Sequence, residues 1–202
     1  AQTDGVNNIN GITVPTDSDV KKNANSDLDK TAAAAKQAID ETSGLTADQK
    51  QTAKDQIDQA VTDAQEKIKN ASDNKGVAAA TAAGKLAIDK VSAKAAIDGA
   101  LTEKNNSIDA APNLTVEEKQ AVKEQANKAA DNAKSAINTA QDNDAVKKAQ
   151  TDGVNNINGI TVPTDSDVKK NANSDLDKTA AAAKQAIDET SGLTADQKQT
   201  AK

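Results

Sequence analysis

TADQKQTAKDQIDQAVTDAQEKIKNA, residues 46–71, has the clearest helical pattern in this chain. Thr46 and Gln49 fit a capping box, in which the Thr oxygen and the Gln side chain satisfy backbone N–H groups at a helix start. Apolar residues then recur at steps of three and four, the spacing that places side chains on one helix face: Ala53, Ile57, Ala60, Ala64, Ile68 and Ala71. The stretch therefore predicts an amphipathic helix that packs against partner helices.

This helix belongs to a tandem array. Residues 1–54 recur unchanged as residues 149–202, so the period of the array is 148. Inside that period, residues 45–50 return in diverged form as residues 114–119, an offset of 69, and the other half-period is therefore 79. Thr115 and Glu118 form the second capping box. The second stripe comprises Val122, Ala126, Ala129, Ala133, Ile137 and Ala140.

Each repeat is predicted to contain three helices. Gly44 and Asn113 precede the capping boxes, and both residue types tolerate the left-handed backbone that often ends a helix, so a first helix should end at each. A third helix should follow the turns at residues 73–74 and 142–143. The first-helix stripe is Val20, Ala24, Leu28, Ala32, Ala35 and Ile39, and the third-helix stripes are Val77, Ala80, Gly84, Ile88 and Val91, then Val146, Ala149, Gly153, Ile157 and Ile160.

Two features of these stripes predict the packing. Gly84 and Gly153 lower helix propensity by about 1 kcal/mol relative to Ala, so they indicate close approach of two backbones. The stripe ending at Ile88 and a later stripe through Ile97, Leu101 and Ile108 differ by roughly 110° in phase at 100° per residue, so successive bundles should use different faces of the helix.

The unequal lengths of the two half-periods predict two kinds of junction. Residues 158–165, NGITVPTD, contain Pro163 and new capping residues, so the third helix should end there and a linker begin. No Pro interrupts residues 75–110, which predict one continuous helix of roughly 55 Å. We therefore expect the end of a repeat plus a linker at 1–15, three-helix repeats at 16–91 and 92–162 that share a helix, and a third repeat starting at 163. The expected fold class is all-α, with tandem three-helix bundles in an elongated rod.

The composition excludes most catalytic chemistry. The hydrophobic fraction is 36% and the aromatic fraction 0%, and His and Cys are absent. The chain therefore has no usual general base at neutral pH, no thiol nucleophile and no usual zinc ligand set. The net charge of −6 disfavours nucleic acid, and no apolar run is long enough for a membrane span. We expect no enzyme activity, no catalytic residue, no cofactor and no metal.

The remaining candidate sites have structural explanations. Asp27 and Asp29 could form an acid/base pair, but carboxylates at helix starts and on polar faces are usually solvated. Residues 142–144 and 17–19 resemble part of a calcium loop without its later Gly and Glu, so capping is the better interpretation. The residues that we single out are caps and core positions: Gly44, Thr46, Gln49, Ile57, Ile68, Ile88, Asn113, Thr115, Glu118, Ile137 and Ile157.

Residues 113–119 (NLTVEEK), 133–137 (AKSAI) and 143–146 (NDAV), in a unit that repeats once per half-period, resemble the domain-of-unknown-function family 1542 repeats of Gram-positive cell-wall-anchored surface proteins. The chain is also similar to the three-helix modules of giant staphylococcal matrix-binding proteins. These resemblances imply an extracellular helical stalk, anchored to the cell wall by other regions, with roles in cell adhesion and biofilm.

Three functions remain open at this point. The first is a monomeric spacer that projects an adhesive domain from the cell wall, with the rest of a multidomain surface protein as its partner. The second is a helical module that binds a host or matrix protein or another stalk, although the sequence shows no aromatic hot spot. The third is a largely disordered, hydrated chain.

Overall fold

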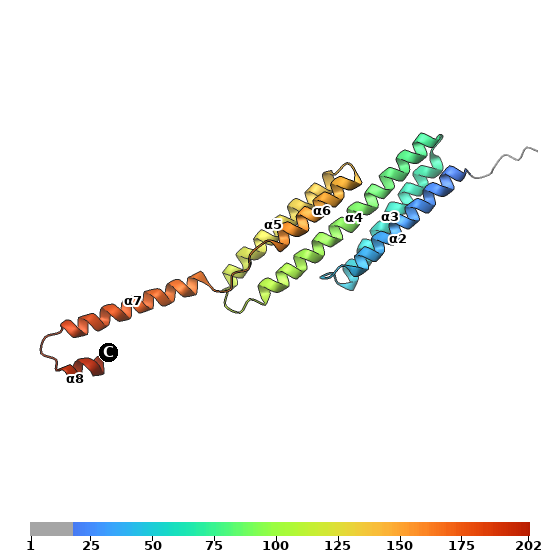
Figure 1. Ribbon diagram of the computed structural model, residues 1–202. Helices are drawn as coiled ribbons and strands as arrows, with labels where there is room; N and C mark the ends of the chain where they lie inside the picture. The colour runs from blue at the N-terminus through green and yellow to red at the C-terminus, as the bar shows by residue number, and fades with distance from the viewer. Residues whose placement is uncertain (1–17) are drawn as a thin grey trace, which may run out of the picture. The chain divides into compact units, whose positions relative to one another are not determined.

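The computed structural model describes residues 18–202, and within that range it contains helices and no strand (Figure 1). The fold is therefore all-α, as predicted, and the third hypothesis, a disordered chain, is wrong for this range. The expected repeat end and linker at 1–15 lie outside the described residues. The helices are α2 (Asp19–Glu41), α3 (Ala47–Asn70), α4 (Asn74–Asp109), α5 (Val116–Thr139), α6 (Asn143–Asn158), α7 (Asp167–Glu189) and α8 (Ala195–Ala201).

Local capping sets the helix starts. At α3, the Thr46 Oγ1 accepts from the Gln49 backbone N at 3.2 Å, and the Gln49 Oε1 accepts from the Thr46 N at 2.8 Å. Gly44, in the loop that follows α2, has φ +78°, the left-handed backbone that a Cβ disfavours. The turn between α2 and α3 therefore follows from three residues that the pattern identifies.

The described residues form two compact units. The first unit includes residues up to 104 and residues 126–159, and it contains α2, α3, most of α4 and α5, and α6. In Figure 1, α2 and α3 lie along the N-terminal part of α4, and α5 and α6 lie along its later part. The second unit comprises residues 105–125 and 160–202, with the start of α5 and all of α7 and α8.

Helix α4 is uninterrupted over 36 residues, as the lack of Pro between residues 75 and 110 predicts. At 1.5 Å per residue its length is about 54 Å. Its Ala-rich sequence favours helix throughout, because Ala has the highest intrinsic helix propensity. The boundary that we predict between residues 91 and 92 falls inside this helix.

The break predicted at residues 158–165 is also present, because α6 ends at Asn158 and α7 begins at Asp167. The two helices are joined by residues 159–166, which include Pro163. Proline has no backbone N–H and clashes with a preceding helical turn, so it stops α6 from continuing. The two junctions therefore differ in the way that the alternation of shorter and longer half-periods indicates.

The same helix sequence is buried in the first repeat and exposed in the third. Leu28 on α2 is 0% exposed, whereas its copy Leu176 on α7 is 66% exposed. Helix α2 packs against α3 and α4 in the first core, whereas no residue of α7 is buried in the described chain. The other residues of the predicted α2 stripe are buried, except for Val20 at its start, which is 41% exposed.

Candidate functional site: the junctions between repeats

The first unit contains two hydrophobic cores that share α4. The first core combines buried residues of α2, α3 and α4: Ala24, Leu28, Ala32, Ala35, Ile39, Ile57, Ala64, Ile68, Val77, Ile88 and Ala95. The second core combines α4, α5 and α6: Ala93, Ile97, Ala100, Ala130, Ala133, Ile137, Ala140, Val146 and Ile157. Burying an Ile or Leu side chain stabilises the fold by roughly 1.5–3 kcal/mol, so these residues replace the missing aromatics.

The two cores overlap along α4 and use opposite faces of it. Val91 and Ala95 contact the first core, while Leu86 and Ala93 belong to or pack on the second. Ile88 and Ile97 are nine residues apart, about 900° of helical rotation, which places them on opposite sides. The sequence correctly predicts different faces, but the predicted phase difference is too small because the stripe omits Leu86, Ala93 and Ala100.

Two glycines allow the close helix approaches that the sequence predicts. A Cβ at Gly84 of α4 would lie 2.5 Å from the Ala64 Cβ and 2.8 Å from the Leu28 Cδ2. A Cβ at Gly153 of α6 would collide with the Ala133 Cβ and lie 2.7 Å from the Ile97 Cδ1. Both contacts lie in the cores, so each glycine sets the spacing of three helices.

The first junction joins the loop after α2 to the middle of α4. Gly44 lies so close to α4 that a Cβ there would collide with the Gly99 carbonyl oxygen, and a Cβ at Gly99 would collide with the Ser43 carbonyl oxygen. Gly99 was not predicted from the sequence. A signal for it is present, since the equivalent positions of the other first helices hold Lys30 and Lys178.

Polar contacts hold α4 to α5 in the same region. Lys134 of α5 forms an ion pair with Asp98, and the Lys90 Nζ donates to the Asn138 carbonyl oxygen at 2.9 Å. The Lys90 contact is repeated in the first bundle, where the Lys21 Nζ donates to the Lys69 carbonyl oxygen at 2.7 Å. Both repeats therefore tie the first helix to the end of the second in the same way.

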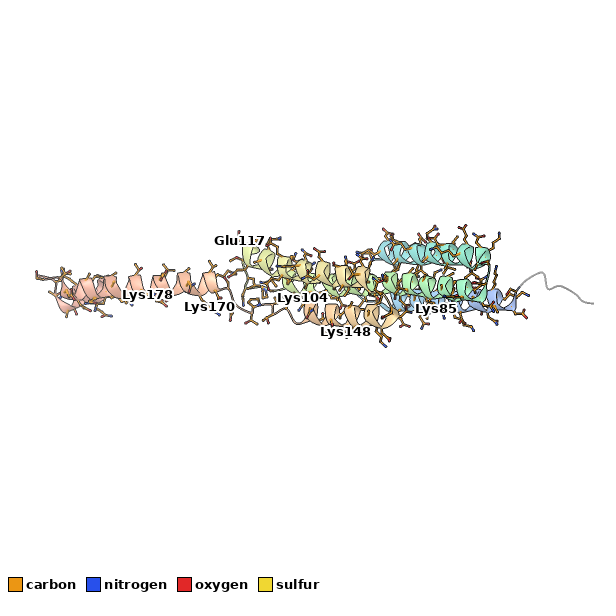
Figure 2. The ribbon with its side chains drawn as sticks, turned by 90° about the horizontal axis from the view of Figure 1, so that it is seen from above. Lys85, Lys104, Glu117, Lys148, Lys170 and Lys178 are labelled. Atoms are coloured by element: carbon orange, nitrogen blue, oxygen red, sulfur yellow. The ribbon has the colours of Figure 1, made fainter. Side chains whose placement is uncertain are left out.

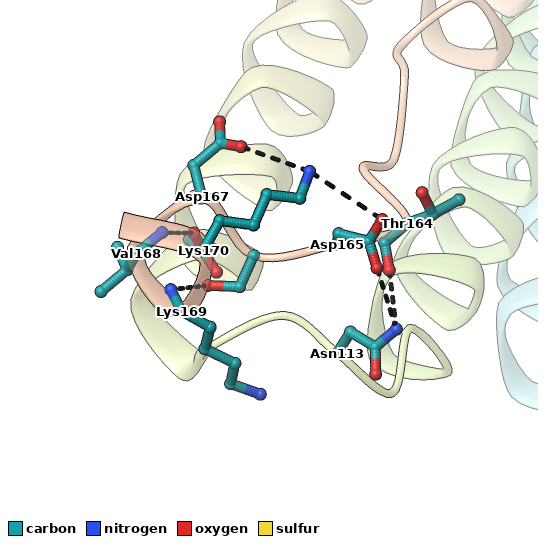
Figure 3. Close-up of polar contacts among 9 residues, drawn as sticks. Asn113, Thr164, Asp165, Asp167, Val168, Lys169 and Lys170 are labelled. Atoms are coloured by element: carbon teal, nitrogen blue, oxygen red, sulfur yellow. Dashed lines mark hydrogen bonds and ion pairs between the residues drawn. The ribbon is translucent and has the colours of Figure 1, made fainter. Parts of the chain in front are cut away.

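The second junction, inside the second unit, holds the loop before α5 against the linker that leads to α7 (Figure 3). The Asn113 Nδ2 donates to the Thr164 carbonyl oxygen at 3.0 Å and to the Asp165 Oδ1 at 3.4 Å. Helix α4 ends at Asp109, just before Asn113, as predicted, but Asn113 does not adopt the left-handed backbone that its residue type tolerates. Its side chain binds the linker instead, and the turn needs no positive φ.

Glu118 has a part in both helix starts of the second unit. Its Oε2 accepts from the Thr115 N at 2.9 Å, which completes the capping box of α5. Its Oε1 accepts from the Val168 N at 3.4 Å, in the first turn of α7. Hydrogen bonds from the Thr115 backbone and then from the Ser166 hydroxyl lower the pKa of this carboxyl below its usual 4.5, and the Val168 N–H adds to the effect.

The remaining residues singled out from the sequence lie in the two cores. Ile57 and Ile68 of α3 and Ile88 of α4 are fully buried in the first, and Ile137 and Ile157 are fully buried in the second. None of them is placed to act on a ligand. The carboxylates Asp27 and Asp29 are exposed; Asp27 pairs with Lys85 at 3.3 Å, and Asp29 accepts from Gln65 at 3.1 Å.

The charged side chains are spread over the helices in both signs. In Figure 2 they project outward along the helices, and the labelled lysines come from α4, α6 and α7. Among residues 18–202, no group of three or more acidic, His or Cys residues could hold a metal ion. The same residues include no helix that is long and apolar enough to cross a membrane.

Asp89 of α4 is a half-buried acid in the first unit. It accepts from the Asn143 Nδ2 at 2.7 Å at the start of α6. Burial raises the pKa of Asp89 above its usual 3.8, and the nearby Lys85 opposes that shift. The start of α6 therefore covers part of this carboxylate.

Comparison with known families decides what this chain is. The family described as Domain of Unknown Function (DUF1542) matches residues 20–92 and again residues 89–165. The chain belongs to the DUF1542 family. The two matches overlap inside α4, so consecutive DUF1542 repeats meet within one helix.

A second family, the GA module, matches residues 167–202. These residues repeat 19–54 unchanged, and 20–54 lie within the first DUF1542 match. The same sequence therefore falls within matches to both families.

The relatives of this DUF1542 chain are very long surface proteins. Extracellular matrix-binding protein EbhA of Staphylococcus aureus strain Mu3 is 30% identical over 190 residues, which cover 90% of this chain and 3% of the relative. Extracellular matrix-binding protein ebh of strain NCTC 8325 is 30% identical over 193 residues, which cover 90% of this chain and 2% of the relative. No solved structure matches the chain significantly. The predicted resemblance to helical repeats of Gram-positive surface proteins is confirmed.

Proposed function

We propose that this DUF1542 segment is a spacer that carries other parts of an extracellular surface protein away from the cell wall. The observation that supports it best is the shared helix α4, in which Ile88 belongs to one core and Ile97 to the next. Two bundles on one helix cannot separate without breaking that helix. At a junction of this kind the next repeat adds length rather than a freely swinging domain.

The composition suits this role. The cores consist of Ile, Leu, Val and Ala, and charged residues of both signs cover the helices. Such a surface stays hydrated and offers no aromatic anchor for a partner. The proposal also places the segment outside the cell, anchored by regions elsewhere in the protein.

Small-angle X-ray scattering on chains of one, two and three full periods tests the spacer. The maximum dimension should rise by a constant increment per period while the cross-section stays constant. A radius of gyration that follows the scaling of a compact domain, about 17 Å for 202 residues, would contradict the spacer.

The relatives' names favour a second candidate, binding of a matrix protein by the helices themselves. A surface plasmon resonance series with immobilised matrix proteins separates the two. Saturable binding by this chain, lost on replacing exposed residues of one helix face, would favour the binding module. A spacer gives no saturable signal with the same material.

A further inference from the structure

We propose that Glu118 is a shared cap that fixes the start of α7 to the start of α5, and that the pair Asn113 and Glu118 specifies a broken junction where Gly44 and Gln49 specify a continuous one. Gly44 and Gln49 occupy the equivalent positions of the first repeat. The inference concerns how repeats are joined and goes beyond the spacer function.

A carboxylate such as that of Glu118 can accept hydrogen bonds from two helix starts at once. A helix N-terminus presents N–H groups without intrahelical partners and a partial positive charge, so it favours an anionic acceptor. Glu118 offers two such oxygens, and each accepts from a different helix start: Oε2 from the Thr115 N and Oε1 from the Val168 N. A Gln side chain has one acceptor oxygen and would present an N–H₂ group to the second N–H.

The state of Ser166 supports a cap that acts across the junction. Ser18 and Ser166 occupy the same place in identical sequence, yet the Ser18 side chain makes no capping hydrogen bond. The Ser166 hydroxyl accepts from the Lys169 N at 3.1 Å, and Ser166 is only 2% exposed. Ser166 is therefore a buried N-cap of α7, two residues before the Val168 N–H that donates to Glu118.

The first repeat shows the alternative arrangement. Gln49 caps its own helix through Thr46, and the next repeat begins inside α4, where no new helix N-terminus needs an acceptor. In place of the Asn113 side chain, Gly44 lets the loop lie directly against Gly99. The repeat with Gly44 and Gln49 is thus followed by a continuous helix, and the repeat with Asn113 and Glu118 is followed by a broken junction.

Glu118→Gln is the direct test, because Gln can still cap α5 as Gln49 caps α3. Since the chain has no Cys, spin labels can be placed at single Cys residues replacing Gln125 and Asn173, which are exposed on α5 and α7. Pulsed electron paramagnetic resonance then measures their distance distribution. In the parent it should be a single narrow peak.

In Glu118→Gln the distance distribution should broaden, because the eight-residue linker then behaves as a flexible chain with a root-mean-square end-to-end distance of about 15 Å. The helix content measured by circular dichroism should stay unchanged. Ser166→Ala should broaden it as well. Gln49→Glu is the matched control and should leave the distribution unchanged. An equally narrow peak in Glu118→Gln and Ser166→Ala, or a broad distribution in the parent, would overturn the proposal.

Discussion

Ile88 and Ile97 lie nine residues apart on one uninterrupted helix, are both fully buried, and belong to different hydrophobic cores on opposite sides of α4. Neither core is complete without its part of α4. The helix is therefore the structural connection between two consecutive repeats.

Ile88→Ala and Ile97→Ala should each destabilise the fold by about 2–5 kcal/mol, because each leaves a cavity in a packed core. The two substitutions should destabilise different helices. Hydrogen exchange should accelerate most in α2 and α3 for Ile88→Ala, and in α5 and α6 for Ile97→Ala. The same exchange pattern in both variants would mean that the two cores are one cooperative unit.

Leu28→Ala and Leu176→Ala compare one substitution in two copies of the same sequence. Leu28 is buried and should lose about 2–5 kcal/mol, whereas Leu176 is largely exposed and should change the stability by less than about 0.5 kcal/mol. Chemical denaturation followed by circular dichroism measures both. Comparable losses at the two positions would show that α7 is buried in solution.

Gly44→Ala and Gly192→Ala separate backbone strain from packing at the first junction. Both glycines have positive φ, so Ala costs about 1–2 kcal/mol at each. A Cβ at position 192 meets nothing within 4 Å, whereas one at position 44 collides with α4 at Gly99. Hydrogen exchange in the following helix should therefore increase more in Gly44→Ala, and equal increases would exclude a tight junction.

Glu118 should make the second junction weaken in acid. Its pKa is lower in the folded state than the usual 4.5, so its contribution is fully present above pH 4.5 and is lost as the pH falls through the lowered value. Amide exchange of Val168 across this pH range measures the effect. Glu118→Gln should remove the pH dependence, and an unchanged profile in that variant would assign it to another group.

The Asp89 carboxylate should destabilise the fold at neutral pH, in contrast to that of Glu118. Burial raises its pKa above 3.8 in the folded state, so the charged form destabilises the fold above the raised value. Asp89→Asn keeps an acceptor for Asn143 and should raise the melting temperature at neutral pH. The gain should shrink as the pH falls toward 3.8, and a loss of stability at neutral pH would contradict this assignment.

The periodic and capping signals predict most of the local structure. The Thr46 and Thr115 capping boxes, the left-handed Gly44, the long helix and the break around Pro163 all arise from short-range chemistry that is visible in sequence. The second role of Glu118 cannot be predicted this way, because its partner Val168 lies on a later helix, far along the chain. The contact that Gly99 makes with Ser43 is likewise long-range, although the comparison with Lys30 and Lys178 marks position 99 as unusual.

The central claim is that the two DUF1542 repeats of this chain share one unbroken helix, and a distance along α4 tests it most directly. Spin labels at Cys residues replacing Lys75 and Asn106, both exposed and near opposite ends of α4, should give a narrow peak in pulsed electron paramagnetic resonance, corresponding to a Cα separation of about 46 Å. A broad distribution, or a clearly shorter distance, would show that the helix is broken and that the two repeats are joined flexibly.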